Sequence, residues 1–122
     1  MPLLLQACPS YRPRWAKYSA EPEFDPGLLY VHLGDFAHHL VGLMKEGKTG
    51  EFSSVFDAIE RLHPEGDSYI QEAAIIGFLE SIQNIAGDSG VDPERFFPYL
   101  GSESASRWKR LNDFWEGKTP HV

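Results

Sequence analysis

The hydrophobic residues of this chain recur every three or four positions along most of its length, which is the spacing of amphipathic helices. The longest such pattern is the stretch GDSYIQEAAIIGFLESIQN, between Gly66 and Asn84. Its apolar positions cover about half of a helical wheel, which is more than a helix with one buried side requires. We therefore predict a helix that starts at Asp67, ends at Gly87 and packs against neighbours on two sides.

Four more segments show the same spacing and have residues at their ends that start or stop helices. The predicted helices cover Leu28–Glu46, Thr49–His63, Asp92–Tyr99 and a last segment from Ser102 or Ser104 to Gly117. The first of these can be capped by Asp25, with Pro26 in the first turn, or by the later pair Gly34-Asp35. Gly47 is expected to end it as the residue that follows the last turn.

The chain before Phe24 contains Pro9, Pro13 and Pro22, so we predict an irregular segment over residues 1–24 with short helical turns, of which Arg14–Ser19 is the clearest. No stretch gives a convincing strand. The sequence therefore predicts an all-α fold, a single domain over residues 1–122 with a helical core over residues 25–122. The architecture is a bundle of about five to six antiparallel helices, or a stack of helical hairpins. The residues predicted to be buried in its core include Phe56, Ile59, Phe78 and Ile82.

The negative charge is concentrated in one part of the chain. The formal net charge is −7, and the 33 residues from Leu62 to Glu94 contain seven acids and no lysine or arginine. The 11 acids and 11 bases of the remaining chain balance each other. A nucleic-acid ligand needs clustered basic residues, so direct nucleic-acid binding is not expected. A surface of one sign favours a basic protein partner, although an acidic surface can also serve solubility alone.

One side of the Asp67–Gly87 helix combines acidic and apolar residues. The residues on this side are Tyr69, Glu72, Ile76, Glu80 and Gln83, and the first four carry its acidic and apolar groups. An aromatic residue and an isoleucine beside two carboxylates are typical of a contact surface, so we predict that these four bind a protein partner. Asp57 and Glu60, placed on the outer side of the preceding helix, extend the same surface if the two helices lie antiparallel.

A second interpretation gives the chain a metal site. If the Leu28–Glu46 helix begins before His32, then His32, Asp35 and His39 share one side of it, and such residues can hold a metal ion. A small metal-dependent or acid–base hydrolase is thus an alternative function. A metal site usually needs a further ligand from another element, and His63 is the internal candidate. Because most helices with such a strip are simply solvated, we predict no metal and no cofactor.

The remaining chemistry in the sequence is sparse. The chain has no GxSxG motif, no phosphate-binding glycine loop and no CxxC pair, so we do not expect an enzyme. The single cysteine, Cys8, cannot form an internal disulfide and is expected to pack as a small apolar side chain. The apolar run Leu3–Leu5 is too short for a secretory signal, and no run is long enough to span a membrane. The expected location is the cytoplasm.

Two stretches give the chain a family resemblance. They are LGDFAHHLVGLMKEGKTGEFSSVFDAIERLHPEGDSYIQEAAIIGFLESIQN and VDPERFFPYLGSESASRWKRLNDFWEGK. The most characteristic parts are Glu65-Gly66-Asp67, Tyr99-Leu100-Gly101 and Phe114-Trp115-Glu116-Gly117. From about Leu28 to Lys118 the chain resembles small all-helical bacterial immunity proteins of polymorphic-toxin and contact-dependent growth-inhibition systems.

This resemblance implies a small, cytoplasmic, non-enzymatic inhibitor that forms a 1:1 complex with the C-terminal domain of a toxin and covers its active or substrate-binding surface. A nuclease toxin is generally basic, which agrees with the acidic segment found above. The resemblance supplies no binding residues, because immunity proteins vary in the surface that contacts the toxin. An adaptor module that binds an unrelated protein is a further alternative.

Overall fold

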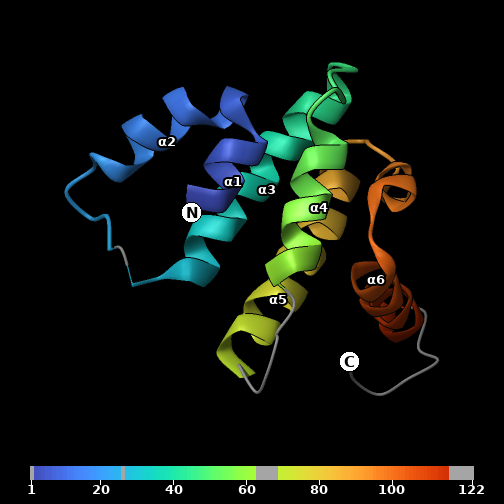
Figure 1. The fold of residues 1–122 in the computed structure, drawn as a ribbon. Coiled ribbons are helices and arrows are strands. Elements are labelled where there is room, and N and C mark those ends of the chain that lie inside the picture. The colour runs from blue at the N-terminus through green and yellow to red at the C-terminus, as the bar shows by residue number, and fades with distance from the viewer. Residues whose placement is uncertain (1, 26, 63–68, 116–122) are drawn as a thin grey trace.

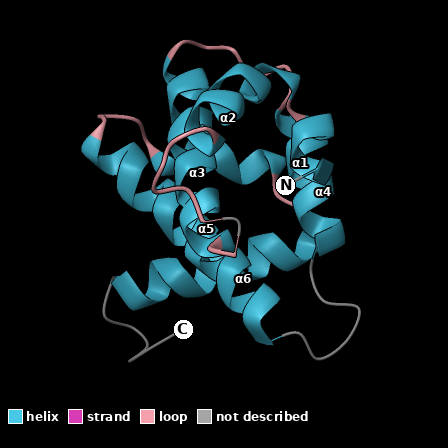
Figure 2. Cartoon of the chain, turned by 90° about the vertical axis from the view of Figure 1, so that its left-hand side faces the viewer, coloured by secondary structure: helices cyan, strands magenta, loops and turns pink. Residues whose placement is uncertain are grey.

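A computed structural model describes residues 2–25, 27–62 and 69–115, with side chains described at 4–25, 27–28, 31–61 and 75–113. This part of the chain contains helices and loops only, so the predicted all-α fold is confirmed (Figure 2). The elements are α1 (Pro2–Ala7), the 3-10 helix η1 (Pro9–Tyr11), α2 (Arg12–Ser19), α3 (Leu29–Lys45), α4 (Phe52–Leu62), α5 (Tyr69–Asp88), the 3-10 helix η2 (Pro93–Tyr99) and α6 (Ser102–Trp115).

The most extensive contact between two helices is that of α3 with α5. Helix α1 packs against α4, and α6 packs against both α4 and α5. In Figure 1, α4 runs down the middle of the view, with α1 and α2 on one side and α6 on the other. The two ends of the described chain therefore lie on opposite sides of α4.

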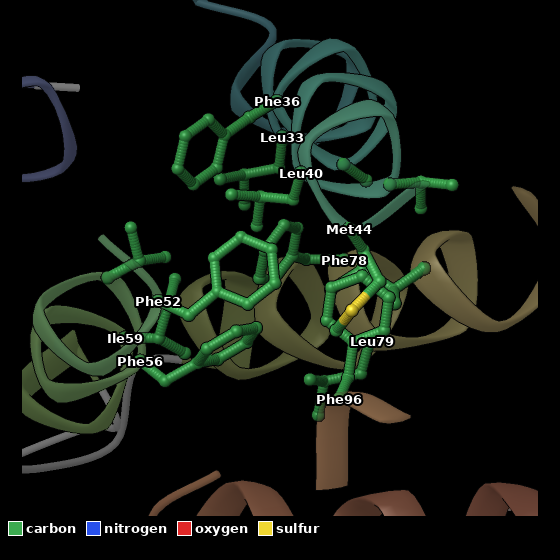
Figure 3. Packing of buried hydrophobic residues seen from close by; sticks show 14 of the residues in the cluster. Leu33, Phe36, Leu40, Met44, Phe52, Phe56, Ile59, Phe78, Leu79 and Phe96 are labelled. Carbon is green, nitrogen blue, oxygen red and sulfur yellow. The ribbon is translucent and has the colours of Figure 1, made fainter. Parts of the chain in front are cut away.

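The core forms where three helices and η2 bring aromatic and aliphatic side chains together (Figure 3). Phe36 of α3 stacks on Phe78 of α5 with ring centroids 5.8 Å apart, and Phe52 of α4 stacks on Phe96 of η2 at 5.4 Å. The four residues predicted for the core, Phe56, Ile59, Phe78 and Ile82, are all buried. The helical spacing of apolar residues thus identified the buried faces correctly.

The N-terminal segment is more ordered than predicted, since Leu4, Cys8 and Tyr11 are buried in the core. Pro9 and Pro13 begin helices instead of limiting them: Pro9 starts η1, and Pro13 lies in the first turn of α2. Proline fits the first helical turn because its missing N–H has no partner there in any case. Residues 1–24 therefore contribute to the core that was predicted for residues 25–122 alone.

Two glycines end helices in the same way. Gly47 after α3 and Gly90 after α5 have φ angles of 75° and 77°, a conformation that other residues adopt at a cost. After Gly47, the N–H of Lys48 returns to the Leu43 carbonyl at 2.8 Å, which closes the last turn. The prediction for Gly47 is confirmed, but Gly87 lies within α5, and the glycine that ends this helix is Gly90.

The start of α3 differs from both predicted caps. Leu28 is the N-cap residue, and no side chain caps this end. The Asp25 carboxylate instead accepts a hydrogen bond from the Gly27 N–H at 2.9 Å, which forms a tight turn before the helix. Gly34 and Asp35 lie within α3. The predicted cap at Asp67 lies outside the described residues.

Candidate protein-binding site

Four of the predicted contact residues lie on α5. The side chains of Tyr69 and Glu72 lie outside those that the structure describes. Ile76 is half-buried and packs against the core, and Glu80 is half-buried. The expected acidic and apolar positions thus follow one another along a single helix, but Ile76 contributes only part of its surface to the outside.

Helix α6 closes one end of this strip. Gln83 follows Glu80 by three positions and is therefore on nearly the same side of α5. It is buried, and its amide donates a hydrogen bond to the Asn112 side chain of α6 at 3.2 Å. The surface that a partner could reach on this side of α5 ends near Glu80.

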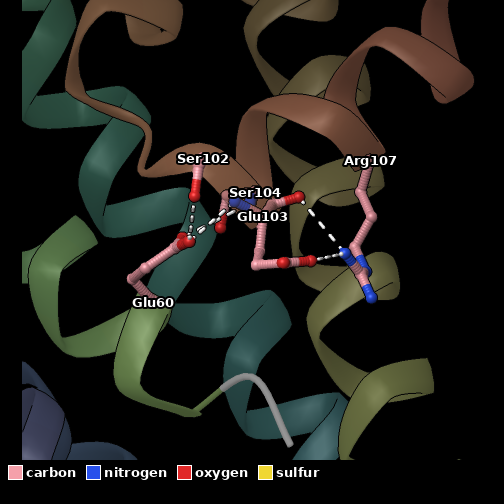
Figure 4. Close-up of polar contacts among 5 residues, drawn as sticks. All are labelled: Glu60, Ser102, Glu103, Ser104 and Arg107. Atoms are coloured by element: carbon pink, nitrogen blue, oxygen red, sulfur yellow. Dashed lines mark hydrogen bonds and ion pairs between the residues drawn. The ribbon is translucent and has the colours of Figure 1, made fainter.

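Glu60 is predicted to lie on the outer side of α4, but in the structure it faces the first turn of α6 (Figure 4). Its carboxylate accepts hydrogen bonds from the backbone N–H of Glu103 at 2.6 Å and of Ser104 at 3.3 Å. The Ser102 hydroxyl donates to the same carboxylate at 3.4 Å. The backbone N–H groups in the first turn of a helix have no partner within that helix, so the Glu60 carboxylate satisfies two of them in α6. A carboxylate at this end of a helix also interacts favourably with the helix dipole.

Glu60 therefore caps α6 from another helix, and the prediction that Ser102 or Ser104 caps it is wrong. Beside this contact, Arg107 donates to the Glu103 carboxylate at 2.8 Å one turn along α6 (Figure 4). A glutamate so engaged is part of the scaffold, and we remove Glu60 from the candidate interface.

Asp57 is exposed one turn before Glu60, and residues three positions apart lie on nearly the same side of a helix. Asp57 lines a cavity of about 210 Å³ whose walls include Gln6 and Ala7 of α1 and Arg61 of α4. Asp57 borders α1, whereas the Glu60 carboxylate is turned toward α6 and is engaged there, so the two do not offer one acidic surface to a partner. The structure thus does not bring all six predicted residues together.

The last acids of the acidic segment, Asp92 and Glu94, have hydrogen-bond partners within the chain. The Asp92 side chain accepts from the Glu94 N–H at 3.0 Å and caps η2. The Glu94 carboxylate accepts hydrogen bonds from the Trp108 indole and, at 3.0 Å, from the Asn112 amide. These contacts fix η2 against α6, while Glu80 and the exposed Asp88 carry the negative charge along α5.

The strip of His32, Asp35 and His39 on α3 is covered by the N-terminal segment. Asp35 accepts hydrogen bonds from the Tyr11 hydroxyl at 2.7 Å and from Arg14 at 3.0 and 3.2 Å. Burial raises the pKa of Asp35, but the hydrogen bonds from Arg14 and Tyr11 outweigh it, so the pKa is lowered overall. Burial and the Asp35 contact raise the pKa of Tyr11. Asp35 therefore holds the N-terminal segment as a charged acceptor.

His39 belongs to a separate polar cluster. Its Nε2 lies 2.9 Å from the Ser10 hydroxyl, and Glu51 accepts from the Ser10 N–H at 3.1 Å and from the Cys8 thiol at 3.6 Å. Burial lowers the pKa of His39. Burial also raises the pKa of Cys8 to about 11, which leaves little of the nucleophilic thiolate at neutral pH.

The Ser10–His39 distance is that of a nucleophile and a base, but the surroundings oppose acyl transfer. The backbone N–H of a nucleophilic serine commonly stabilises the oxyanion, and here the Ser10 N–H donates to Glu51. The Glu51 carboxylate would also repel an oxyanion at this point. Among the described residues, no group of three His, Cys, Asp or Glu side chains is placed to hold a metal ion. The side chains of the alternative hydrolase site instead bind the N-terminal segment to α3.

His32 lies in an aromatic cluster that sequence reasoning missed. Its ring stacks on Phe24 with centroids 4.7 Å apart and meets Trp15 edge-on at 5.5 Å. Its Nδ1 is hydrogen-bonded to the Tyr18 hydroxyl at 2.8 Å. A signal was present in the sequence, because Trp15 and Tyr18 are three residues apart in the predicted Arg14–Ser19 turn and thus share a side of it.

No helix in the described part of the chain is both long and apolar enough to cross a membrane. No curated protein and no solved structure matches the sequence. One family model does match, over residues 1–116, and it is described as a domain of unknown function, DUF7674. Because this match covers nearly the whole chain, the protein belongs to the DUF7674 family.

Proposed function

We propose that this protein is a cytoplasmic immunity-type inhibitor, without enzymatic activity of its own, that binds the C-terminal domain of a basic toxin in a 1:1 complex. The observation that carries the proposal is the segregation of charge, since seven acids and no lysine or arginine lie between Leu62 and Glu94. The resemblance of the chain to small helical immunity proteins supports the proposal that this acidic segment binds a toxin. A toxin that cuts nucleic acid must itself attract phosphate, and an acidic protein can occupy the same basic surface.

The contacts around α3 support binding over catalysis. The residues of the alternative metal site are engaged elsewhere: Asp35 with Tyr11 and Arg14, His39 with Ser10, and His32 with Tyr18. These contacts fasten the N-terminal segment to the core, which makes a rigid scaffold. A rigid inhibitor loses less conformational entropy when it binds.

We place the interface on the strip of α5 that carries Tyr69, Glu72, Ile76 and Glu80, and omit Glu60 because it caps α6. Asp57 belongs to this interface only if the partner also reaches the α1 side of α4. Opposite charge speeds the encounter, and burial of Tyr69 and Ile76 slows dissociation.

The test of the function is co-expression with the C-terminal domain encoded by the gene immediately upstream, since an immunity gene lies next to its toxin. We expect the chain to restore the growth of cells that make this domain and to co-purify with it at 1:1 stoichiometry. If cells are arrested whether or not the chain is present, and no complex forms, the proposal is wrong.

The position of the interface is tested by reversing a charge on α5. Glu80→Lys should lower the association rate constant and weaken its dependence on salt, with little change in the midpoint of thermal unfolding. Glu46→Lys is the matched control, because it makes the same charge change at an exposed residue outside the acidic segment. Equal association rates for the two variants, at low and high salt, would place the interface elsewhere.

A further inference from the structure

A cavity of about 200 Å³ lies between the end of α2 and the start of α3. Its walls include Tyr18 and Phe24 from the aromatic cluster, and Leu28 and Val31 beside the first turn of α3. The volume is below the range of about 300–1,000 Å³ that is typical of sites for drug-sized ligands. It is suited to a single long side chain.

His32 also lines this cavity, and it is the one lining residue that is buried, with 3% of its surface exposed. Its Nδ1 is taken by the Tyr18 hydroxyl. Its Nε2 is buried and has no hydrogen-bond partner among the described residues. A buried polar atom without a partner is rare, because leaving it so costs free energy, and a group that hydrogen-bonds to it would recover that free energy.

Three carboxylates line the same cavity: Glu21, Glu23 and Asp25. All three are exposed, as are Leu28 and Val31, so these residues form its rim, while the buried His32 lies deeper. Carboxylates only accept hydrogen bonds, and the Nε2 of His32 is an acceptor too when its Nδ1 carries the proton and donates to Tyr18. In this tautomer all the side-chain groups named above are acceptors, and a ligand that only donates, which is a cation, matches them.

The surface beside the cavity indicates a protein partner. Leu28 and Val31 are 48% and 51% exposed, and they are the exposed large hydrophobic residues of the described chain. Exposed apolar residues next to charged groups are typical of contact surfaces. A lysine or arginine side chain has an apolar stem and a charged head. The stem matches the apolar residues of this cavity, and the head matches its polar groups.

We propose that this cavity receives one basic side chain, a lysine or arginine, of a protein partner. The stem lies against Phe24, Leu28 and Val31, and the cationic head is held by the rim carboxylates and by the Nε2 of His32. This inference takes the basic character of the partner from the proposed function, but it locates a second contact, on the α2–α3 side and away from the strip of α5.

The experiment titrates the ¹⁵N-labelled protein with N-acetyl-arginine methylamide, N-acetyl-lysine methylamide and, as the uncharged analogue, N-acetyl-norleucine methylamide. We expect the two basic probes, and not the norleucine probe, to shift the imidazole ¹⁵N resonance of His32 Nε2 and the amide of Val31. The stronger of the two basic probes identifies the side chain. No shift with either basic probe, or an equal shift with norleucine, would overturn the proposal.

The rim is tested with the triple variant Glu21→Gln, Glu23→Gln, Asp25→Asn, in which the side-chain oxygen at position 25 can still accept from the Gly27 N–H. The affinity for the basic probes should fall by about fivefold or more at low salt. The control is Glu46→Gln, Asp88→Asn, Glu103→Gln, which removes three charges away from the cavity and should retain the affinity. If both triple variants lose the same affinity for the basic probes, the loss is an effect of net charge alone, and the proposed site is wrong.

These outcomes separate the site from the proposed function. If the upstream domain is not a partner but the probes bind as expected, the cavity is a cation site and the function is wrong. If the upstream domain binds the rim variant and the unaltered chain equally well, the function stands and the cavity is not part of its interface.

Discussion

The carboxylate of Glu60 in α4 accepts a hydrogen bond from the backbone N–H of Glu103, at the start of α6, with the two atoms 2.6 Å apart. The residues are 43 positions apart in sequence. Helix α6 is therefore capped by a side chain of another helix, and the contact also fixes where α6 begins against α4. Gly101 precedes this turn, and a Cβ atom there would collide with the Glu60 side chain, so another residue at this position would require the Glu60 carboxylate to shift from its capping position.

Replacement of Glu60 should destabilise the protein. We expect Glu60→Ala to lower the free energy of unfolding by about 1–2 kcal/mol, the usual effect of losing a capping side chain. Urea denaturation monitored by circular dichroism gives this value. Asp57→Ala removes an exposed acid one turn earlier in α4 and should change stability by less than about 0.5 kcal/mol. Equal effects for the two variants would contradict the capping role.

Tyr11 and Asp35 should be coupled in stability. Tyr11→Phe removes the hydroxyl that donates to Asp35, and Asp35→Asn removes the charge that accepts from Tyr11 and Arg14. Each change should cost about 1–2 kcal/mol. In a double-mutant cycle the coupling should be up to about 1 kcal/mol, because Tyr11→Phe removes this hydrogen bond and Asp35→Asn weakens it by removing the charge of its acceptor. Fully additive losses would show that the contact contributes nothing to stability.

Stability should fall in acid. For both Asp35 and Glu51, burial raises the pKa but hydrogen bonds outweigh it, so the folded pKa values lie below their ordinary values of 3.8 and 4.5. The unfolded chain then binds more protons, and the stability that these groups contribute is present above the ordinary values and is lost as the pH falls through the lowered ones. The double variant Asp35→Asn, Glu51→Gln should show a flatter decline of unfolding free energy below about pH 5. An unchanged decline would assign the acid sensitivity to other carboxylates.

Cys8 should be unreactive in the folded protein. Its side chain is fully buried, and burial raises its pKa to about 11. Iodoacetamide at about pH 8, below the ordinary thiol pKa, should therefore label the native protein far more slowly than the protein in denaturing urea, as mass spectrometry can measure. Ser10→Ala removes the neighbouring hydroxyl and should not by itself expose the thiol. Rapid, stoichiometric labelling of the native protein would show that the N-terminal segment opens readily.

The sequence alone predicted the all-α fold, most of the helices and the buried residues Phe56, Ile59, Phe78 and Ile82. These features depend on local information, because the spacing of apolar residues fixes which side of a helix is buried. The error in the N-terminal segment has a local cause too. Proline interrupts a helix at interior positions, whereas Pro9 and Pro13 occupy first turns, where proline is tolerated.

The polar contacts were decided by the tertiary structure. Glu60, Asp35 and His39 were interpreted from the sequence as solvated or site-forming residues, and each finds its partner in a segment 21 to 43 residues away. A helical wheel shows which side a residue occupies but not which element packs against that side. The sequence therefore determined the helices, their buried faces and the acidic segment. Only the packing of α6 on α4, and of the N-terminal segment on α3, determined which acids act as caps and anchors, because hydrogen bonds form between groups that the whole fold brings within about 3 Å.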